Sequence, residues 1–249
     1  MLSESFLKRK ALVAYITAGD PSLAETEKLV YSLEKAGADI IELGIPFSDP
    51  LADGPVIQAS HQRALKNKVD LPKVFKLVGK LRRRTNVPIC FMLSYNLVLQ
   101  YGLEKYYNDC RNYQVNGTIV PDLPPEEAGL SAAGVDQIFL VAPTSSDERI
   151  RLAAAKSSGF IYLVSAAGVT GARKELSQDL SGLVSRIRKI SQLPVAIGFG
   201  ISSAKQAAGA AGSADGVIVG SAIVGLIGQK KNRAAIKLIA SMRKAIDAL

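Results

Sequence analysis

Apolar runs recur along the chain and alternate with segments of helical periodicity. Each run is nearly continuous in Val, Ile, Leu or Phe, a pattern typical of strands that are covered on both faces of a parallel sheet. The runs span residues 11–17, 39–45, 87–93, 117–121, 137–143, 160–165, 194–200 and 215–221. The pattern of hydrophobic positions therefore predicts a parallel sheet built from these eight segments.

Helix start and stop signals lie between the runs. Ser22 is followed by Glu25 at the spacing of a capping box, and Gly37 ends that segment. A second start signal, at Ser146 or Asp147, precedes another helical segment. The sequence thus predicts strands and helices in alternation.

Eight strand–helix alternations in 249 residues match the usual size of a (β/α)8 barrel. A doubly wound open sheet is the alternative, but for a dinucleotide it would carry a Gly-rich turn after its first strand. The stretch "YITAGDPS" contains no such turn. We therefore predict an α/β fold, a TIM barrel with a single domain over residues 1–249 and an active site at the carboxyl ends of the strands.

The last two predicted strands both run into Gly and Ser and then into a helix, in "PVAIGFGISS" and "GVIVGSAIV". Backbone N–H groups of such turns converge on one spot, and the helix dipole favours an anion there. In barrels these two loops are a frequent phosphate site. We therefore assign Gly200, Gly220 and Ser221 to a phosphate; the alternative is that these glycines only end strands.

Carboxylates interrupt the apolar stretch "IIELGIPFSDPLADGP" at residues 40–55. Strand parity puts Glu42 on the same side as Ile40 and Gly44, and in a barrel it is then buried or at the mouth, close to the carboxyl end. Partial burial raises a carboxyl pKa towards the range useful for proton transfer. Asp53 follows in a turn-rich loop that can project over the same end, so the two acids can take different roles. The alternatives are a salt-bridged core acid for Glu42 and a turn or N-cap residue for Asp53.

The stretch "ELGIPFSDPLADGPVIQ" resembles the signature of the tryptophan synthase α subunit family, a barrel that cleaves indole-3-glycerol phosphate. Further stretches resemble that family in its own order along nearly the whole chain. They are "AYITAGDPS", "PDLPPEE", "YLVSAAGVTGAR", "IGFGISS" and "GVIVGSAIV". The resemblance implies a retro-aldol cleavage that releases indole and glyceraldehyde 3-phosphate.

The resemblance also implies roles for single residues. Glu42 matches the glutamate that moves protons between the glycerol hydroxyl and indole C3. Asp53 matches the aspartate that holds the indole N–H, and Tyr162 a tyrosine near the glycerol. Thr170 and Gly171 match a loop that closes over the site, with Thr170 contacting Asp53.

The phosphate and indole pocket of the family is matched by Phe199, Gly200, Gly220 and Ser221. No metal or organic cofactor is expected, because the chain has a single His and no ligand cluster. That residue, His61, is interpreted as a surface helix residue.

Three positions depart from the family pattern. Ala166 stands where a bulky basic residue precedes "GVTG", and Ser94 and Leu97 alter the end of the third strand. The resemblance implies an α2β2 assembly with a pyridoxal phosphate β subunit that receives indole through a tunnel and docks near that strand end. The departures leave an alternative open, a weakly active subunit that acts mainly as an allosteric activator of the β subunit.

The net charge is +9, from 31 Lys and Arg against 22 Asp and Glu. This balance suits an anionic substrate or a solvated basic surface, and no nucleic-acid-binding motif accompanies it. Cys90 and Cys110 have neither CxxC spacing nor a nearby His, so we expect plain thiols in a reducing compartment. The apolar run after "KRK" is short and leads into a helix start, so we predict a cytoplasmic protein without a membrane partner.

Overall fold

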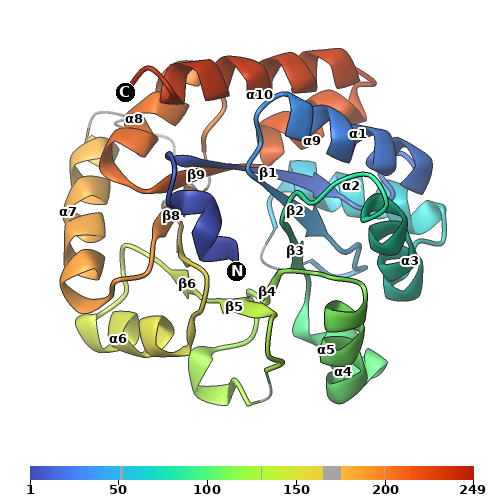
Figure 1. The fold of residues 1–249 in the computed structure, drawn as a ribbon, viewed down its shortest axis with the longest axis horizontal. Helices are drawn as coiled ribbons and strands as arrows, with labels where there is room; N and C mark the ends of the chain where they lie inside the picture. Colours follow the sequence, from blue (N-terminus) through green and yellow to red (C-terminus); the bar gives the residue numbers. More distant parts are fainter. Residues whose placement is uncertain (51–52, 130, 165–174, 199) are drawn as a thin grey trace.

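The protein, described here from a computed structural model, is a ring of parallel strands inside a ring of helices (Figure 1). The structure describes residues 1–50, 53–129, 131–164, 175–198 and 200–249. Its strands follow the order β5-β4-β3-β2-β1-β9-β8-β7-β6, and all pairs are parallel. The strands are β1 (Ala11–Thr17), β2 (Ile40–Gly44), β3 (Ile89–Met92), β4 (Gly117–Ile119), β5 (Asp136–Ile138), β6 (Leu140–Val141), β7 (Ile161–Val164), β8 (Val195–Gly198) and β9 (Gly216–Val219).

The strand order closes on itself. β5 and β6 stand at its two ends but are separated along the chain by Phe139 alone, so they are two halves of one predicted strand. β4 pairs with the first half and β7 with the second. Among the described residues the predicted barrel is therefore confirmed, and a doubly wound open sheet is excluded.

Helices cover the outside of the barrel between the strands (Figure 1). Ser22 and Ser146 cap α1 and α6 by accepting hydrogen bonds from Glu25 N and Arg149 N. Within the described residues, every helix is too short or too polar to traverse a lipid bilayer. The helices are α1 (Leu23–Lys35), α2 (Pro55–Lys66), α3 (Leu71–Leu81), α4 (Tyr95–Tyr101), α5 (Leu103–Asn112), α6 (Asp147–Lys156), α7 (Glu175–Ile190), α8 (Ala204–Ser213), α9 (Ser221–Gly228) and α10 (Asn232–Ile246), with short 3₁₀ turns η1 (Leu2–Phe6) and η2 (Pro125–Glu127).

The barrel interior is packed by side chains of alternate strand positions and is not a pore. These include Val13, Ile40, Cys90, Ile119, Ile138, Tyr162, Ala196 and Ile218. Two interior glycines make room for two tyrosines. A Cβ on Gly44 would lie 2.1 Å from the Tyr15 hydroxyl, and one on Gly198 would lie 2.5 Å from the Tyr162 ring. Each large ring therefore lies over a residue without a side chain.

The amino-terminal turn η1 covers the end of the barrel where the strands begin, and Figure 1 shows it in front of the ring of strands. Leu2 is fully buried among the interior side chains, and its N–H donates to Asp136 Oδ2 at 2.7 Å. Phe6 packs on Phe160, with ring centroids 5.4 Å apart. This end of the barrel is thereby closed, which leaves the carboxyl ends of the strands for a site.

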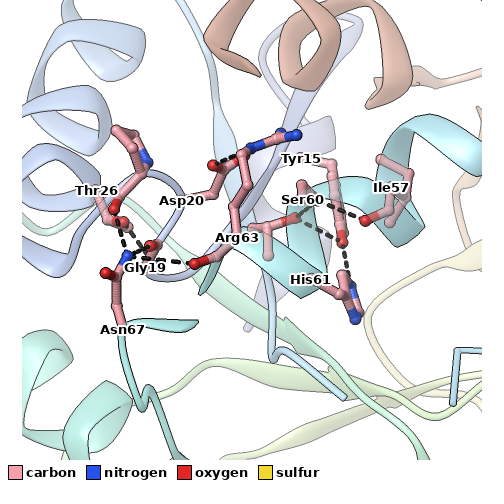
Figure 2. A network of polar contacts seen from close by, with 11 residues as sticks. Tyr15, Gly19, Asp20, Thr26, Ile57, Ser60, His61, Arg63 and Asn67 are labelled. Atoms are coloured by element: carbon pink, nitrogen blue, oxygen red, sulfur yellow. Dashed lines mark hydrogen bonds and ion pairs between the residues drawn. The ribbon is translucent and has the colours of Figure 1, made fainter. Parts of the chain in front are cut away.

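Helix α2 is anchored to the loop after β1 (Figure 2). Arg63 donates to both carboxylate oxygens of Asp20, at 2.8 and 2.7 Å. The side-chain amide of Asn67 donates to Pro21 O at 2.6 Å. These contacts fix the helix against β1, and the helix begins two residues after Asp53.

Candidate active site

A cavity of about 330 Å³ lies at the carboxyl ends of the strands. Six of the site residues predicted from the sequence line it together: Glu42, Asp53, Tyr162, Gly200, Gly220 and Ser221. They come from β2, the β2–α2 loop, β7, and the turns after β8 and β9. The structure thus gathers in one cavity residues separated by up to 179 positions along the chain (42 to 221).

Glu42 is the buried acid of the site. It lies on β2 beside Tyr15 of β1 and Cys90 of β3, and its side chain is 1% exposed. Among the described residues, no group hydrogen-bonds to either carboxylate oxygen, and no cation lies within ion-pair distance. The alternative of a salt-bridged core acid therefore fails within the described structure.

Asp53 is the more exposed acid. Its side chain is 20% exposed, and its backbone is held by two contacts, Asp53 N to Pro50 O at 3.1 Å and Gln58 Nε2 to Asp53 O at 2.8 Å. The N-cap of α2 is Gly54, so Asp53 is not the capping residue. Its carboxylate is thereby left available to the cavity.

Burial separates the pKa values of the two acids. It raises the pKa of Glu42 to about 8, with a smaller contribution from the negative charge of Asp53. Burial also raises the pKa of Asp53, to about 6. Near pH 7 the pair therefore holds one proton, mostly on Glu42, and Asp53 carries the negative charge.

The two glycine turns after β8 and β9 also line the cavity. Gly200 has φ +77°, a left-handed conformation that glycine adopts without strain. Gly220 is the N-cap of α9 and has no side chain to accept the first N–H groups of that helix. Uncapped N–H groups and the positive end of the helix dipole suit an anion, consistent with the assignment of a phosphate.

Two tyrosines line the cavity as well. Tyr162 was predicted and lines the cavity; Tyr15 was not predicted, although it also lines it. Burial raises the pKa of both phenols above the ordinary value, so both stay protonated at neutral pH. Tyr15 lies at the position of β1 that pairs with Glu42 of β2, and this register becomes visible only in the structure.

Four positions assigned by resemblance lie outside the described residues: Ala166, Thr170, Gly171 and Phe199. The other two departures from the family pattern are described. Ser94 caps α4 and donates to Asp122 Oδ2 at 2.6 Å, and Leu97 packs half-buried against the core. Neither of these two lines the cavity that contains Glu42.

The prediction that His61 is a surface residue is wrong, because it is 5% exposed. Polar residues of a helix usually face water, but α2 turns Ser60, His61 and Ala64 towards the barrel. Ser60 and His61 are accommodated there by contacts with Thr17, Tyr15 and Phe47.

The fold is a (β/α)8 barrel with a cavity at the carboxyl ends of its strands, the architecture of a barrel enzyme. In the part of the chain that the structure describes, no three His, Cys, Asp or Glu side chains gather as a metal site. The described lining of the cavity offers two carboxyl groups with separated pKa values.

Comparison with known proteins identifies the family. Residues 3–248 match the family "Tryptophan synthase alpha chain". The tryptophan synthase alpha chain of Dehalococcoides mccartyi is 51% identical over 231 residues, 91% of either chain, and that of Geotalea daltonii is 48% identical over 246 residues, 97% of this chain and 93% of the relative. The chain belongs to the tryptophan synthase alpha chain family.

Solved structures agree with this membership. The tryptophan synthase subunit alpha of Legionella pneumophila superposes with a TM-score of 0.91 at 36% identity, over 100% of this chain and 98% of the other. A tryptophan synthase structure from Mycobacterium tuberculosis gives 0.90 at 35% identity, over 98% and 97% of the two chains. The chain is accordingly a carbon–carbon lyase that cleaves indole-3-glycerol phosphate in tryptophan biosynthesis.

Proposed function

We propose that Glu42 carries the proton transfers of this cleavage. The protonated carboxyl donates to indole C3, and the carboxylate then accepts the proton of the glycerol hydroxyl. The bond between C3 and the glycerol carbon breaks, the hydroxyl carbon becomes the aldehyde of glyceraldehyde 3-phosphate, and the glutamic acid is regenerated. A pKa of about 8 suits a group that starts the cycle protonated at neutral pH.

Asp53 is proposed to accept the indole N–H. Protonation at C3 develops positive charge on the indole nitrogen, and an ionised carboxylate stabilises that charge in a site with little water. Because its pKa of about 6 lies below neutrality, Asp53 is ionised while Glu42 is still protonated. Each carboxyl group thus holds the protonation state that its role requires.

The remaining residues are proposed to bind and enclose the substrate. Gly200, Gly220 and Ser221 bind the phosphate through backbone N–H groups and the amino-terminal end of α9. Tyr162 lies along the glycerol. The parts assigned to Phe199 in the pocket and to Thr170 and Gly171 in a closing loop remain predictions from resemblance.

One observation carries the proposal. The Glu42 carboxyl is buried without a hydrogen-bond partner among the described residues, and it opens on the same cavity as the glycine turns. Such a group costs folding free energy, which supports a functional reason for its presence. A substrate that spans the cavity would supply the missing partner.

The test is steady-state release of indole by the isolated chain. Glu42→Gln keeps the shape of the side chain but removes the exchangeable proton, so we expect turnover to fall about 10³-fold. Glu104→Gln, an exposed change on α5, is the matched control and is expected to leave turnover unchanged. Turnover by Glu42→Gln within tenfold of the unmodified chain would refute the assigned role.

We also propose that the chain works in the cytoplasm with a tryptophan synthase β subunit, in an α2β2 assembly that passes indole to that subunit's pyridoxal phosphate. The whole-enzyme structures from M. tuberculosis among its relatives support this association. The alternative of a weakly active activator is not favoured by the comparisons. Indole release by the isolated chain separates the two, because an activator alone would raise β-subunit turnover without releasing indole itself.

A further inference from the structure

His61, the single histidine of the chain, lies beside the proposed catalytic aspartate. It lines a second cavity, of about 270 Å³, which shares Tyr15, Asp53 and Met92 with the first. Its Nε2 atom is 3.4 Å from Tyr15 Oη and 3.7 Å from Asp53 Oδ2. The mechanism above gives this buried side chain no part.

The tautomer of His61 follows from its other nitrogen. Phe47 N–H donates to Nδ1 at 3.1 Å, so Nδ1 must present a lone pair. Burial lowers the pKa of the imidazole, which keeps the ring neutral at neutral pH. A neutral ring with a lone pair at Nδ1 carries its proton at Nε2, the nitrogen that faces Tyr15 and Asp53.

A series of hydrogen bonds between hydroxyl groups determines which group can accept the Nε2 proton of His61. Ser60 Oγ donates to Ile57 O at 2.7 Å, so towards Thr17 Oγ1, at 2.6 Å, it can only accept. Thr17 therefore donates to Ser60 and accepts from Tyr15 Oη, at 3.4 Å. The single proton of each hydroxyl is thereby assigned.

The end of this series is His61. Because Tyr15 directs its proton at Thr17, its oxygen accepts from His61 and has no proton left for Asp53. Figure 2 shows Tyr15 and His61 meeting beside α2, with Ser60 turned towards Ile57. Among the described residues, His61 is the one Lys, Arg or His side chain with a nitrogen within 4.0 Å of the Asp53 carboxylate, at 3.7 Å.

We propose that His61 is a positioning residue. Its one Nε2 proton faces both Tyr15 Oη and Asp53 Oδ2 in this structure, and with substrate bound it turns from Tyr15 to one carboxylate oxygen of Asp53, which leaves the other oxygen for the indole N–H. This inference rests on the proposed role of Asp53. The separation of 3.7 Å is longer than a hydrogen bond, and contacts of this kind shorten when a substrate occupies the site. The loop that carries Asp53 has little distance to move for the contact to form.

Other titratable groups face His61 from the elements around it. They are Tyr15 from β1, Asp20 from the β1–α1 loop, Asp49 and Asp53 from the β2–α2 loop, and Asp122 across the second cavity. All the carboxylates among them favour a donor at His61, and Asp53 is the one within ion-pair distance in the described structure.

Two substitutions of His61 test the roles of its two ring nitrogens separately. In His61→Asn the amide oxygen takes the place of Nδ1 and still accepts from Phe47 N–H, but nothing reaches Asp53. In His61→Gln the amide nitrogen takes the place of Nε2 and donates to Asp53, but the acceptor for Phe47 is lost. We expect His61→Asn to lower kcat for indole release about tenfold with little change in KM, and His61→Gln to stay within about threefold of the unmodified chain.

The acid limb of the pH–rate profile is the second readout. A donor to the ionised form lowers a carboxyl pKa. In His61→Asn we therefore expect the acid limb to move to higher pH by about half a unit or more, and in His61→Gln to stay. If His61 only held the Phe47 loop, His61→Gln would lose more activity than His61→Asn. That result would overturn the proposal.

A double-mutant comparison shows whether His61 acts through Asp53. In an Asp53→Asn background, His61→Asn is expected to cost no further activity, because the group it positions is gone. An equal loss in both backgrounds, or no loss in either, would contradict the inference. Full turnover by Asp53→Asn alone would instead refute the role proposed for Asp53, so the two failures are distinguishable.

Discussion

At the scale of the residue, Glu42 is held in a state that destabilises the folded chain. Its carboxyl is buried, and no described residue hydrogen-bonds to it. Burial raises its pKa to about 8, so the folded protein binds a proton that the unfolded chain releases near pH 4.5. The contribution of Glu42 to stability is therefore most favourable below the unfolded pKa and declines as pH rises towards 8.

Replacing Glu42 by Gln removes this pH-dependent cost. We expect the free energy of unfolding of Glu42→Gln, relative to the unmodified chain, to be higher at pH 8 than at pH 4 by on the order of 2 kcal/mol or more. Urea unfolding at pH 4 and pH 8 measures this difference in the free energy of unfolding, with Glu104→Gln as control. A difference that is the same at both pH values would show that Glu42 titrates normally in the folded protein.

The two acids also predict the pH dependence of kcat/KM. Activity needs Asp53 ionised, so it falls on the acid side near pH 6, and it needs Glu42 protonated, so it falls on the alkaline side near pH 8. The substrate phosphate also titrates near pH 6, which makes the alkaline limb the diagnostic one. Initial rates from pH 5 to 9.5 test this, and a rate that stays level above pH 8.5 would count against Glu42 as the acid.

Site residues could be predicted from the sequence where a polar side chain interrupts an apolar stretch. Glu42 interrupts an apolar strand, and Asp53 follows in the same motif. Tyr15 and His61 gave no such contrast, since an aromatic residue in a strand and a polar residue in a helix are both ordinary. Their places depend on which face of α2 meets β1, which is decided by tertiary contacts such as Ser60 with Thr17.

At the scale of the element, α2 connects the site to the barrel wall. The helix starts next to Asp53 and carries His61 on its buried face. Its other end is held by Arg63 on Asp20, whose side chain is 2% exposed. The pair holds the helix, which begins two residues after Asp53, against the β1–α1 loop.

Arg63→Ala leaves the Asp20 carboxylate buried without its cation. The arginine is partly exposed but the carboxylate is buried, and a buried charge left without its partner is strongly destabilising, so we expect the free energy of unfolding to fall by about 3 kcal/mol in urea titrations. Lys28→Ala, which breaks an exposed pair with Glu25, is the control and is expected to change it by less than about 0.5 kcal/mol. Adding Asp20→Asn to Arg63→Ala is expected to recover part of the loss; no recovery would mean that the charge is not the cause.

Capping signals predicted the starts of α1 and α6 well, because a Ser side chain that accepts the third N–H is a local interaction. The interruption between β5 and β6 was not predicted. The run 137–143 reads as one continuous strand, and the break at Phe139 depends on its neighbours β4 and β7. A pairing between segments distant in sequence leaves no local pattern.

At the scale of the whole molecule, the spacing of apolar runs was sufficient to predict the barrel. Eight buried runs with helices between them have few other ways to cover both faces of every strand. The closure at the amino-terminal end was not foreseen, because η1 is a short turn outside the repeat. Its side chains fill space that the strands alone leave open.

The fully buried Leu2 allows this closure to be tested. Leu2→Ala removes a side chain that packs inside the barrel, and we expect the free energy of unfolding to fall by about 3 kcal/mol. Leu7→Ala, at a position 80% exposed, is the control and is expected to change it by less than about 0.5 kcal/mol. Thermal or urea unfolding measures both, and equal values for the two variants would show that η1 is not part of the core.

The position of η1 also determines when this turn can dock on the barrel during synthesis. Residues 2–6 leave the ribosome before the strands they pack on, because Phe6 packs where β7 and β9 begin, more than 150 residues later in the chain (6 to 160). This segment can therefore dock only after those strands have been translated. A nascent chain arrested before β9 is expected to leave this segment open to proteases, and release of the full-length chain to protect it.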